Sequence, residues 1–139
     1  TLIELLVVVA IIGILAAVGV VAYNGYTSAA KANAVKTIGA QTAKYMQAEI
    51  TKCTLDSSAD VLYGVACSML NTKTAVTSML GQPDKSPVFT DQKVYKPGTS
   101  AEYGYVVLNK KSTTEIEIYT CWKSGCSAND SNTVTVTKE

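Results

Sequence analysis

The sequence predicts an α+β protein in which a long N-terminal α-helix packs against a C-terminal antiparallel β-sheet of three or four strands. The first 52 residues contain no proline and space their apolar residues as a helix does. After residue 101 the apolar and polar residues alternate with the period of a strand. Strands and helices do not alternate along the chain, which argues against a parallel sheet.

The helix begins in an apolar run that has the length of a membrane span. The 18 residues from Leu5 to Ala22 carry no charge, and as a helix they rise about 27 Å, close to the thickness of a bilayer's hydrocarbon core. We assign residues 1–28 to this hydrophobic half of the helix. Gly13 and Gly19 interrupt it, and small residues in such helices favour close packing against another helix.

Glu4 stands directly before the apolar run and is its most informative residue. A carboxylate near the membrane is costly and usually functional, and it needs a cationic partner. The chain has no Arg, and its first Lys is Lys31. The nearest cation is therefore an N-terminal amine, that of Thr1 in the same chain or that of a neighbouring copy.

Residues 29–139 are expected to form a globular head. Residues 29–52 continue the helix as an amphipathic rod, and residues 53–100 form a connecting region. In that region we expect a short helix capped by Ser57 to Asp60 and running to Leu70, then a second from Thr74 to Leu80. The expected apolar stripe of residues 29–52 and its continuation consists of Ala30, Ala34, Ile38, Tyr45 or Met46, Ile50 and Cys53.

Residues 101–139 carry the predicted sheet and a cysteine loop. We expect strands at 103–108, 115–122 and 133–137, with a further edge strand within 88–95. Ile116 and Ile118 alternate with Glu115 and Glu117, so one sheet face packs on the helix and the other is wet. The two glutamates follow Lys110 and Lys111 in sequence, and we interpret them as a solvated, salt-paired surface.

Composition excludes several kinds of chemistry. The chain has a formal net charge of +1, no His and no Arg. It therefore lacks the commonest general base and metal ligand and the bidentate side chain that reads phosphate or guanine. We expect no catalytic residue, no metal, no cofactor and no specific contact with nucleic acid, and hence no enzyme.

Four cysteines follow the apolar run, and an even number in a small exported domain predicts two disulfides. Three pairings are conceivable. Cys121 and Cys126 are spaced for a bridge across a tight loop between facing strand residues, which leaves Cys53 for Cys67. A zinc site would need paired C-x-x-C spacing or His, and the sequence has neither.

The segments Thr1-Leu2-Ile3-Glu4-Leu5 and Ala10 to Ala17 resemble the mature N-terminus of a bacterial type IV pilin, a likeness confined to about the first 25 residues. The resemblance implies the pilin fold, cleavage and N-methylation by a prepilin peptidase, and polymerisation into a filament by an assembly machinery. The family begins with a phenylalanine, which we expect, N-methylated, before Thr1. Many members have a helix-bending proline where this chain has Val21.

The resemblance implies the structural subunit of an extracellular pilus (fimbrium), held in the inner membrane before assembly and serving adhesion, surface motility or DNA uptake. Glu4 would pair with the N-terminal amine of a neighbouring subunit, and Thr1, Gly13 and Gly19 would lie in the contact between subunits. We expect the helix to loosen between Gly13 and Gly19 on assembly. The alternatives are a pseudopilin of a type II secretion system and a membrane-anchored periplasmic binding protein.

Overall fold

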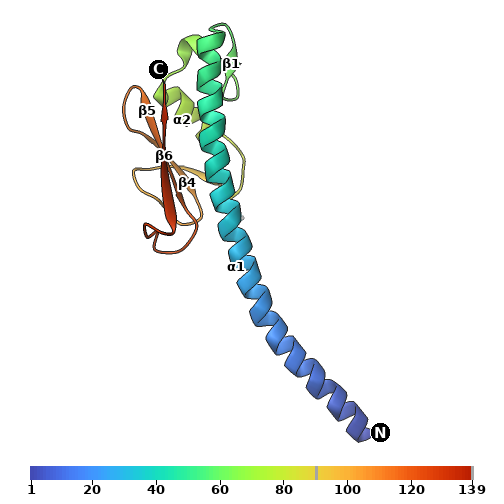
Figure 1. Ribbon diagram of the computed structural model, residues 1–139. Coiled ribbons are helices and arrows are strands. Elements are labelled where there is room, and N and C mark those ends of the chain that lie inside the picture. The colour runs from blue at the N-terminus through green and yellow to red at the C-terminus, as the bar shows by residue number, and fades with distance from the viewer. Residues whose placement is uncertain (90, 139) are drawn as a thin grey trace. The chain divides into compact units, whose positions relative to one another are not determined.

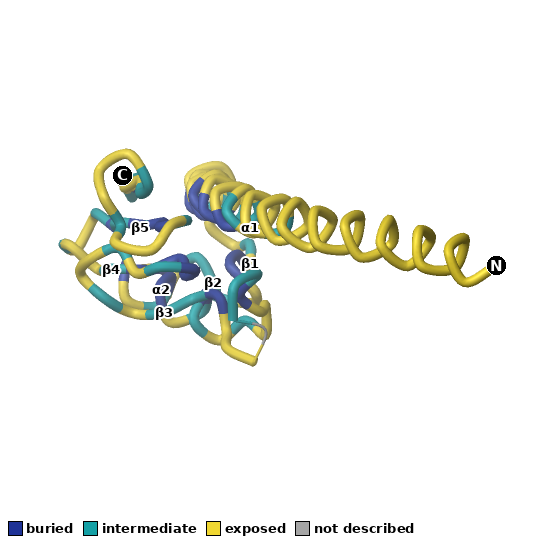
Figure 2. Tube along the Cα trace, turned by 90° about the horizontal axis from the view of Figure 1, so that it is seen from below, coloured by how far each residue is buried: buried dark blue, intermediate teal, exposed yellow. Residues whose placement is uncertain are grey.

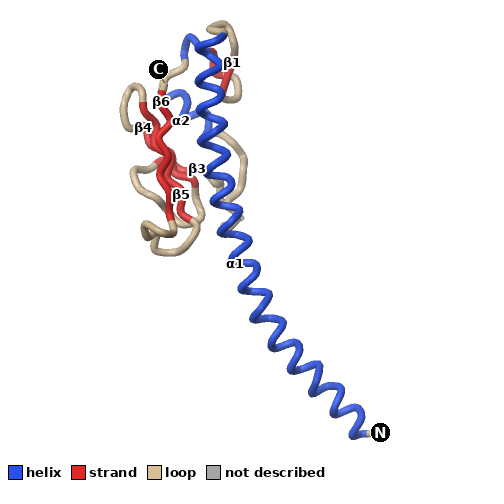
Figure 3. Tube along the Cα trace, in the orientation of Figure 1, coloured by secondary structure: helices blue, strands red, loops and turns tan. Residues whose placement is uncertain are grey.

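The computed structural model describes residues 1–89 and 91–138. The chain divides into two compact units, residues 1–31 and residues 32–139, and each is described by itself. Helix α1, Leu2–Leu55, contributes to both. The predicted α+β class is confirmed, because the second unit combines the carboxyl half of α1 with a four-stranded sheet (Figures 1 and 3).

The sheet consists of β3 (Tyr95–Pro97), β4 (Val106–Lys110), β5 (Glu115–Cys121) and β6 (Ser131–Thr137), in that spatial order. The pairs β4–β5 and β5–β6 are antiparallel, as predicted. The edge strand differs, because β3 lies later than expected and pairs parallel to β4, with Tyr95 opposite Val106. The two strands are joined by a loop of only eight residues, 98–105. The connection contains no helix, so the sequence lacks the strand–helix–strand pattern that usually predicts a parallel pair. Pro97 fits an edge position because it cannot donate to a second ladder.

The core of the second unit lies between the carboxyl half of α1 and the sheet (Figure 2). Met46, Ile50, Ile116, Ile118 and Val136 are nearly or completely buried there. The alternation predicted for residues 115–122 is confirmed for Ile116 and Ile118, which face the core, whereas Trp122 lies beyond the end of β5 and is only half-buried. Burying side chains of this size stabilises the fold by roughly 1.5–3 kcal/mol each.

The helix face that packs on the sheet is only partly the predicted one. Met46 and Ile50 belong to it, and Ile38, Tyr45 and Cys53 lie at its margin. The prediction was wrong for Ala30, which is exposed, and Ala34, which is only half-buried. The residues of α1 that pack on the sheet form a stripe beside the predicted one. This stripe includes Gly39, where α1 comes closest to the sheet. The buried residues of α1 are Val35, Gly39, Thr42, Ala43, Met46 and Ile50.

Gly39 sets the closest approach of α1 to the sheet. A Cβ placed on Gly39 would lie 2.2 Å from Thr120 Oγ1 and 2.9 Å from Thr120 Cβ. Thr120 is itself buried in β5, and its Cβ does not move when the side chain rotates, so rotation would not clear the space. Only glycine permits this separation.

The connecting region holds one of its two predicted helices. Helix α2, Thr72–Leu80, is confirmed and begins two residues earlier than expected. Asn71 caps it: its Oδ1 accepts from the backbone N–H groups of Lys73 and Thr74 at 2.9 and 3.0 Å. The Thr74 hydroxyl oxygen accepts in return from Asn71 N–H, which completes a capping box.

The helix expected up to Leu70 is wrong. The segment instead forms a hairpin of β1 (Asp60–Val61) and β2 (Val65–Ala66), followed by a 3₁₀ turn, η1 (Cys67–Met69). The hairpin turns through Leu62, Tyr63 and Gly64, all with positive φ. Such angles are uncommon for residues other than glycine and end any helix. A short apolar run cannot be assigned to helix or strand by its periodicity alone.

Candidate functional site: the exposed apolar helix

The first unit, residues 1–31, is an apolar helical segment without a covering partner in the part of the chain that the structure describes. Every residue from Thr1 to Tyr26 is exposed. An 18-residue window of this helix has a mean hydropathy of 3.1, and none of it is buried. By length and composition the helix could cross a membrane. A contiguous apolar surface of this extent has to be covered, by lipid or by other helices.

Glu4 lies at the amino end of this surface and pairs with the amine of its own chain. The Thr1 ammonium lies 2.6 Å from Glu4 Oε2, and both side chains are more than three-quarters exposed. Glu4 also lies in the first turn of α1, where the helix dipole favours a negative charge. In this single chain the charge of Glu4 is therefore compensated in water, where such a pair contributes little to stability.

Gly13 and Gly19 lie on the same exposed helix and contact nothing. A Cβ added to either would find no atom within 4 Å outside the local helix. Glycine in a helix costs about 1 kcal/mol relative to alanine, and no contact within the described chain offsets that cost. Helix α1 is continuous through residues 12–20, so the loosening expected on assembly stays a prediction about the assembled state.

The structure thus brings Thr1 and Glu4 together at one helix end and spaces Gly13 and Gly19 along the same segment. This arrangement provides an apolar surface with one exposed ion pair at its amino end. It is suited to association with lipid or with other helices. It does not bring together a nucleophile, a base and an acid.

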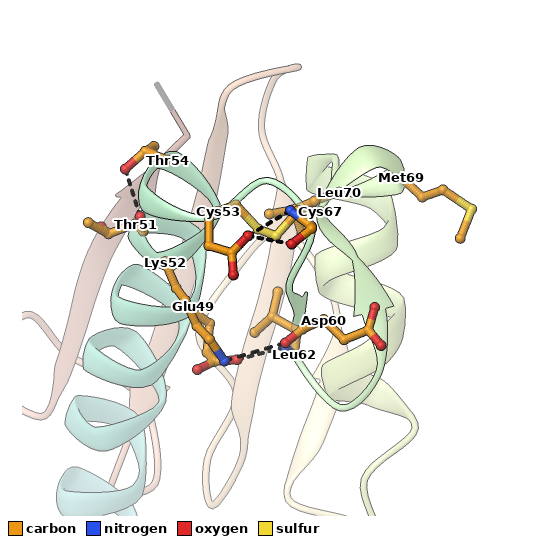
Figure 4. Close-up of a disulfide and its surroundings, with 12 residues drawn as sticks. Glu49, Thr51, Lys52, Cys53, Thr54, Asp60, Leu62, Cys67, Met69 and Leu70 are labelled. Atoms are coloured by element: carbon orange, nitrogen blue, oxygen red, sulfur yellow. Dashed lines mark hydrogen bonds between the residues drawn. A yellow bond between two sulfur atoms is a disulfide. The ribbon is translucent and has the colours of Figure 1, made fainter.

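The four cysteines lie in the second unit and pair as expected. Cys53 bonds to Cys67 with Cα atoms 5.4 Å apart, and Cys121 bonds to Cys126 with Cα atoms 5.5 Å apart. The first bond ties the carboxyl end of α1 to the end of the hairpin (Figure 4). The second closes a short loop between β5 and β6.

Side-chain contacts support the hairpin beside the first disulfide. Leu62 N–H donates to Glu49 Oε2 at 3.0 Å, and Lys52 Nζ approaches the Asp60 carbonyl oxygen at 3.5 Å (Figure 4). The Ser78 hydroxyl donates to the Leu62 carbonyl oxygen. Both polar groups of the buried, left-handed Leu62 are therefore satisfied by residues distant in the sequence.

Of the two lysines predicted to pair with Glu115 and Glu117, Lys111 does so and Lys110 forms no ion pair among the described residues. Lys111 Nζ lies 3.0 Å from Glu117 Oε1 and 3.9 Å from Glu115 Oε2. The Tyr119 hydroxyl and the Asn109 amide both donate to Glu117 Oε2. The Tyr119 hydrogen bond, followed by that of Lys111, holds the pKa of Glu117 below its ordinary value. The same contact with Glu117 raises the pKa of Lys111.

Sequence reasoning missed two features of the second unit. Lys36 Nζ lies 4.4 Å from the centre of the Trp122 ring, a cation–π contact between α1 and the segment after β5. A cavity lined by three tyrosines also lies beside α1. No local sequence pattern predicts either feature, because each joins residues far apart in the chain. Lys36 and Trp122 are 86 positions apart, and Tyr45 and Tyr63 are 18 apart.

Comparisons of the chain with protein-family models, with curated proteins and with solved structures give no match.

Proposed function

We propose that the protein is the structural subunit of a type IV pilus. In this proposal it is stored in the inner membrane and polymerises through the amino half of α1 into an extracellular fibre. The observation that carries the proposal is an apolar helix exposed over residues 1–26, with one carboxylate at its amino end. The residues of this segment resemble the N-terminus of type IV pilins, and the α+β fold is compatible with theirs.

The exposed helix supports assembly because transfer from lipid to a bundle of helices leaves its apolar side chains in an apolar setting. Hydrophobic burial therefore gives the transfer little direction. Glu4 supplies direction. A carboxylate and an ammonium that are each buried alone cost several kcal/mol, and pairing them removes most of that cost. A subunit displaced along the bundle would leave both charges unpaired, so the pair also sets the register.

The ion pair seen in the single chain fits this role. Glu4 is within 2.6 Å of an amine already, and the pair is exposed rather than buried. Assembly exchanges this intrachain amine for that of a neighbouring subunit. An N-methylated residue before Thr1 would make the Thr1 nitrogen a peptide amide and would itself carry the cationic amine, so Glu4 of one subunit would then pair with the amine of that residue in its neighbour.

Electron microscopy of material purified from the cell surface tests the proposal directly. We expect filaments, and expect Glu4→Ala to give membrane-inserted, folded protein that forms at least tenfold fewer of them, the effect of losing roughly 1.4 kcal/mol or more. Glu4→Asp should be intermediate. Glu102→Ala is the matched control, because it removes a carboxylate from an exposed pair with Lys96 in the second unit and should leave filament number unchanged.

Two outcomes would contradict the proposal. Normal filament number and symmetry in Glu4→Ala would show that Glu4 does not pair between subunits. Protein that external protease cannot release from intact cells would favour the short periplasmic assembly of a pseudopilin. Two disulfides support the exposed fibre, because such bonds resist the proteases and shear met outside the cell.

A further inference from the structure

A cavity of about 350 Å³ lies in the second unit, beside the carboxyl half of α1. Its walls come from five places: α1, the β1–β2 turn, α2, the loop after α2 and the edge strand β3. Its volume is within the range of small-molecule sites, which is about 300–1,000 Å³. The pilus proposal does not involve this cavity, so the inference below is independent of it.

Three tyrosines dominate the lining, namely Tyr45 of α1, Tyr63 of the hairpin turn and Tyr95 of β3. The ring centres of Tyr45 and Tyr63 lie 5.5 Å apart, with the ring planes inclined at 47°. Tyr95 is held through its hydroxyl, 3.3 Å from Thr42 Oγ1. Tyr63 is 57% exposed, so a ligand can reach the ring pair from solvent.

The charged side chains in the cavity lining are Asp84 and Lys85, one of each sign. Asp84 lines the cavity and is exposed, and within the described residues its carboxylate forms no ion pair. Burial, and then the nearby charge of Glu49, raises the pKa of Tyr45; burial likewise raises the pKa of Tyr95. Both tyrosines are therefore neutral phenols at physiological pH, with a carboxylate close to each.

The basic residue among the described lining side chains is Lys85, and its ammonium is directed elsewhere. Lys85 Nζ donates to the backbone carbonyl oxygen of Asp91, at 3.4 Å. The cavity thus combines the negative faces of aromatic rings with a carboxylate that lacks a partner. This combination attracts cations that are only weakly hydrated, because they lose little solvation on entering.

We propose that the cavity formed by Tyr45, Tyr63, Tyr95 and Asp84 binds a small organic cation of the quaternary ammonium class. The inclined rings of Tyr45 and Tyr63 take the alkylated nitrogen, and Asp84 supplies the opposite charge. Such a group occurs free, as in choline, or as the headgroup of a choline phospholipid. The chemistry recognised is the same in both.

Saturation-transfer NMR on the full chain in dodecyl maltoside micelles tests this proposal, because that detergent carries no cation. The probes are choline and 3,3-dimethylbutan-1-ol, which has the same shape and no charge. We expect choline to bind with a dissociation constant on the order of 1 mM. The neutral analogue should bind about tenfold more weakly.

Matched variants locate the site. Tyr45→Leu and Asp84→Asn should each weaken choline binding by about threefold to tenfold. Tyr63→Asn should do the same while tolerating the left-handed backbone at that position. Asp91→Asn is the control, because it makes the same charge change nearby but outside the cavity lining. Glycerophosphocholine as a third probe shows whether the free cation or the headgroup is preferred.

Three results would overturn the proposal. The first is no transfer to choline up to about 20 mM, twenty times the expected dissociation constant. The second is equal binding of the neutral analogue. The third is equal loss of binding in Asp84→Asn and Asp91→Asn, which would show attraction by net charge alone. Circular dichroism of each variant confirms that it is folded before its binding is compared.

Discussion

Gly39 and Gly13 both lie in helix α1, and their surroundings are opposite. Gly39 is buried against Thr120, and an added Cβ would lie 2.2 Å from the threonine hydroxyl. Gly13 is exposed, and an added Cβ would meet nothing within 4 Å. Packing within the second unit therefore requires glycine at position 39, whereas no contact within the first unit requires glycine at position 13. Contacts within the described residues therefore account for Gly39 and do not account for Gly13.

We expect the largest effect on stability from a substitution at Gly39. Gly39→Val should destabilise the second unit by about 3 kcal/mol, because it forces α1 away from β5 in a well-packed core. Thermal unfolding of the full chain in maltoside micelles, followed by near-ultraviolet circular dichroism of Trp122, measures this. Adding Thr120→Ala removes two of the three close atoms and should restore part of the loss. Equal stability of Gly39→Val and the wild type would show that the approach is looser than described.

The next largest loss of stability should come from removing a disulfide, and the bond that closes the longer loop should contribute more. Replacing Cys53 and Cys67 by serine should cost about 3 kcal/mol, and replacing Cys121 and Cys126 about 2 kcal/mol, from the loop-closure entropy of 14- and 5-residue separations. The first pair also restrains a hairpin with two non-glycine residues at positive φ.

Thermal midpoints of the two double variants decide this order. Both variants should insert in the membrane at wild-type levels, because neither bond lies in the first unit, and both should reduce surface fibres. An order reversed in the measured midpoints would contradict the entropic argument. An unchanged midpoint for the Cys121 and Cys126 variant would show that this loop is held by other contacts.

Gly13→Ala tests the exposed glycine, and its effect on the stability of the single chain should be opposite to that of Gly39→Val. In the single chain it should be neutral or stabilise the helix by up to about 1 kcal/mol, because the site is open. In filaments it should reduce assembly, since small residues allow helices to approach closely. Filament counts and the helicity of micelle-bound subunits, measured together, separate these effects. Unchanged assembly would remove Gly13 from the subunit contact.

The same contrast explains how much the sequence could predict. The long helix through the apolar run and the strand predicted at 115–122 depend on local pattern, and both are confirmed, the strand ending one residue earlier than predicted. The hairpin at 60–66 was not predicted, because the contacts that hold it come from Glu49, Ser78 and the Cys53–Cys67 bond, all outside the segment itself. The tyrosine cavity was missed for the same reason. The role proposed for Glu4 rests on the resemblance of the residues around it to a family, and its contacts in the described chain do not reveal that role.

We expect the smallest effect for the pH dependence of stability that arises from Glu117, on the sheet face turned away from the core. The hydrogen bond from Tyr119, and then the contact with Lys111, hold the pKa of Glu117 below its ordinary value. A carboxyl with a depressed folded-state pKa stabilises the fold above its unfolded pKa, about 4.3, and this stabilisation is lost as the pH falls through the folded value. Glu117→Gln should therefore lower the thermal midpoint slightly at pH 7 and leave it unchanged at pH 2.

Tyr119→Phe sharpens this test, because it keeps the ring and removes the hydroxyl that donates to Glu117. Its acid-side loss of stability should be smaller than that of the wild type and larger than that of Glu117→Gln. Lys111 is exposed and Glu117 is only partly buried, so added salt should also reduce the difference between the wild type and Glu117→Gln. A wild-type pH profile in Glu117→Gln would mean that the wet face contributes nothing measurable, and that the second unit is held by its core and disulfides alone.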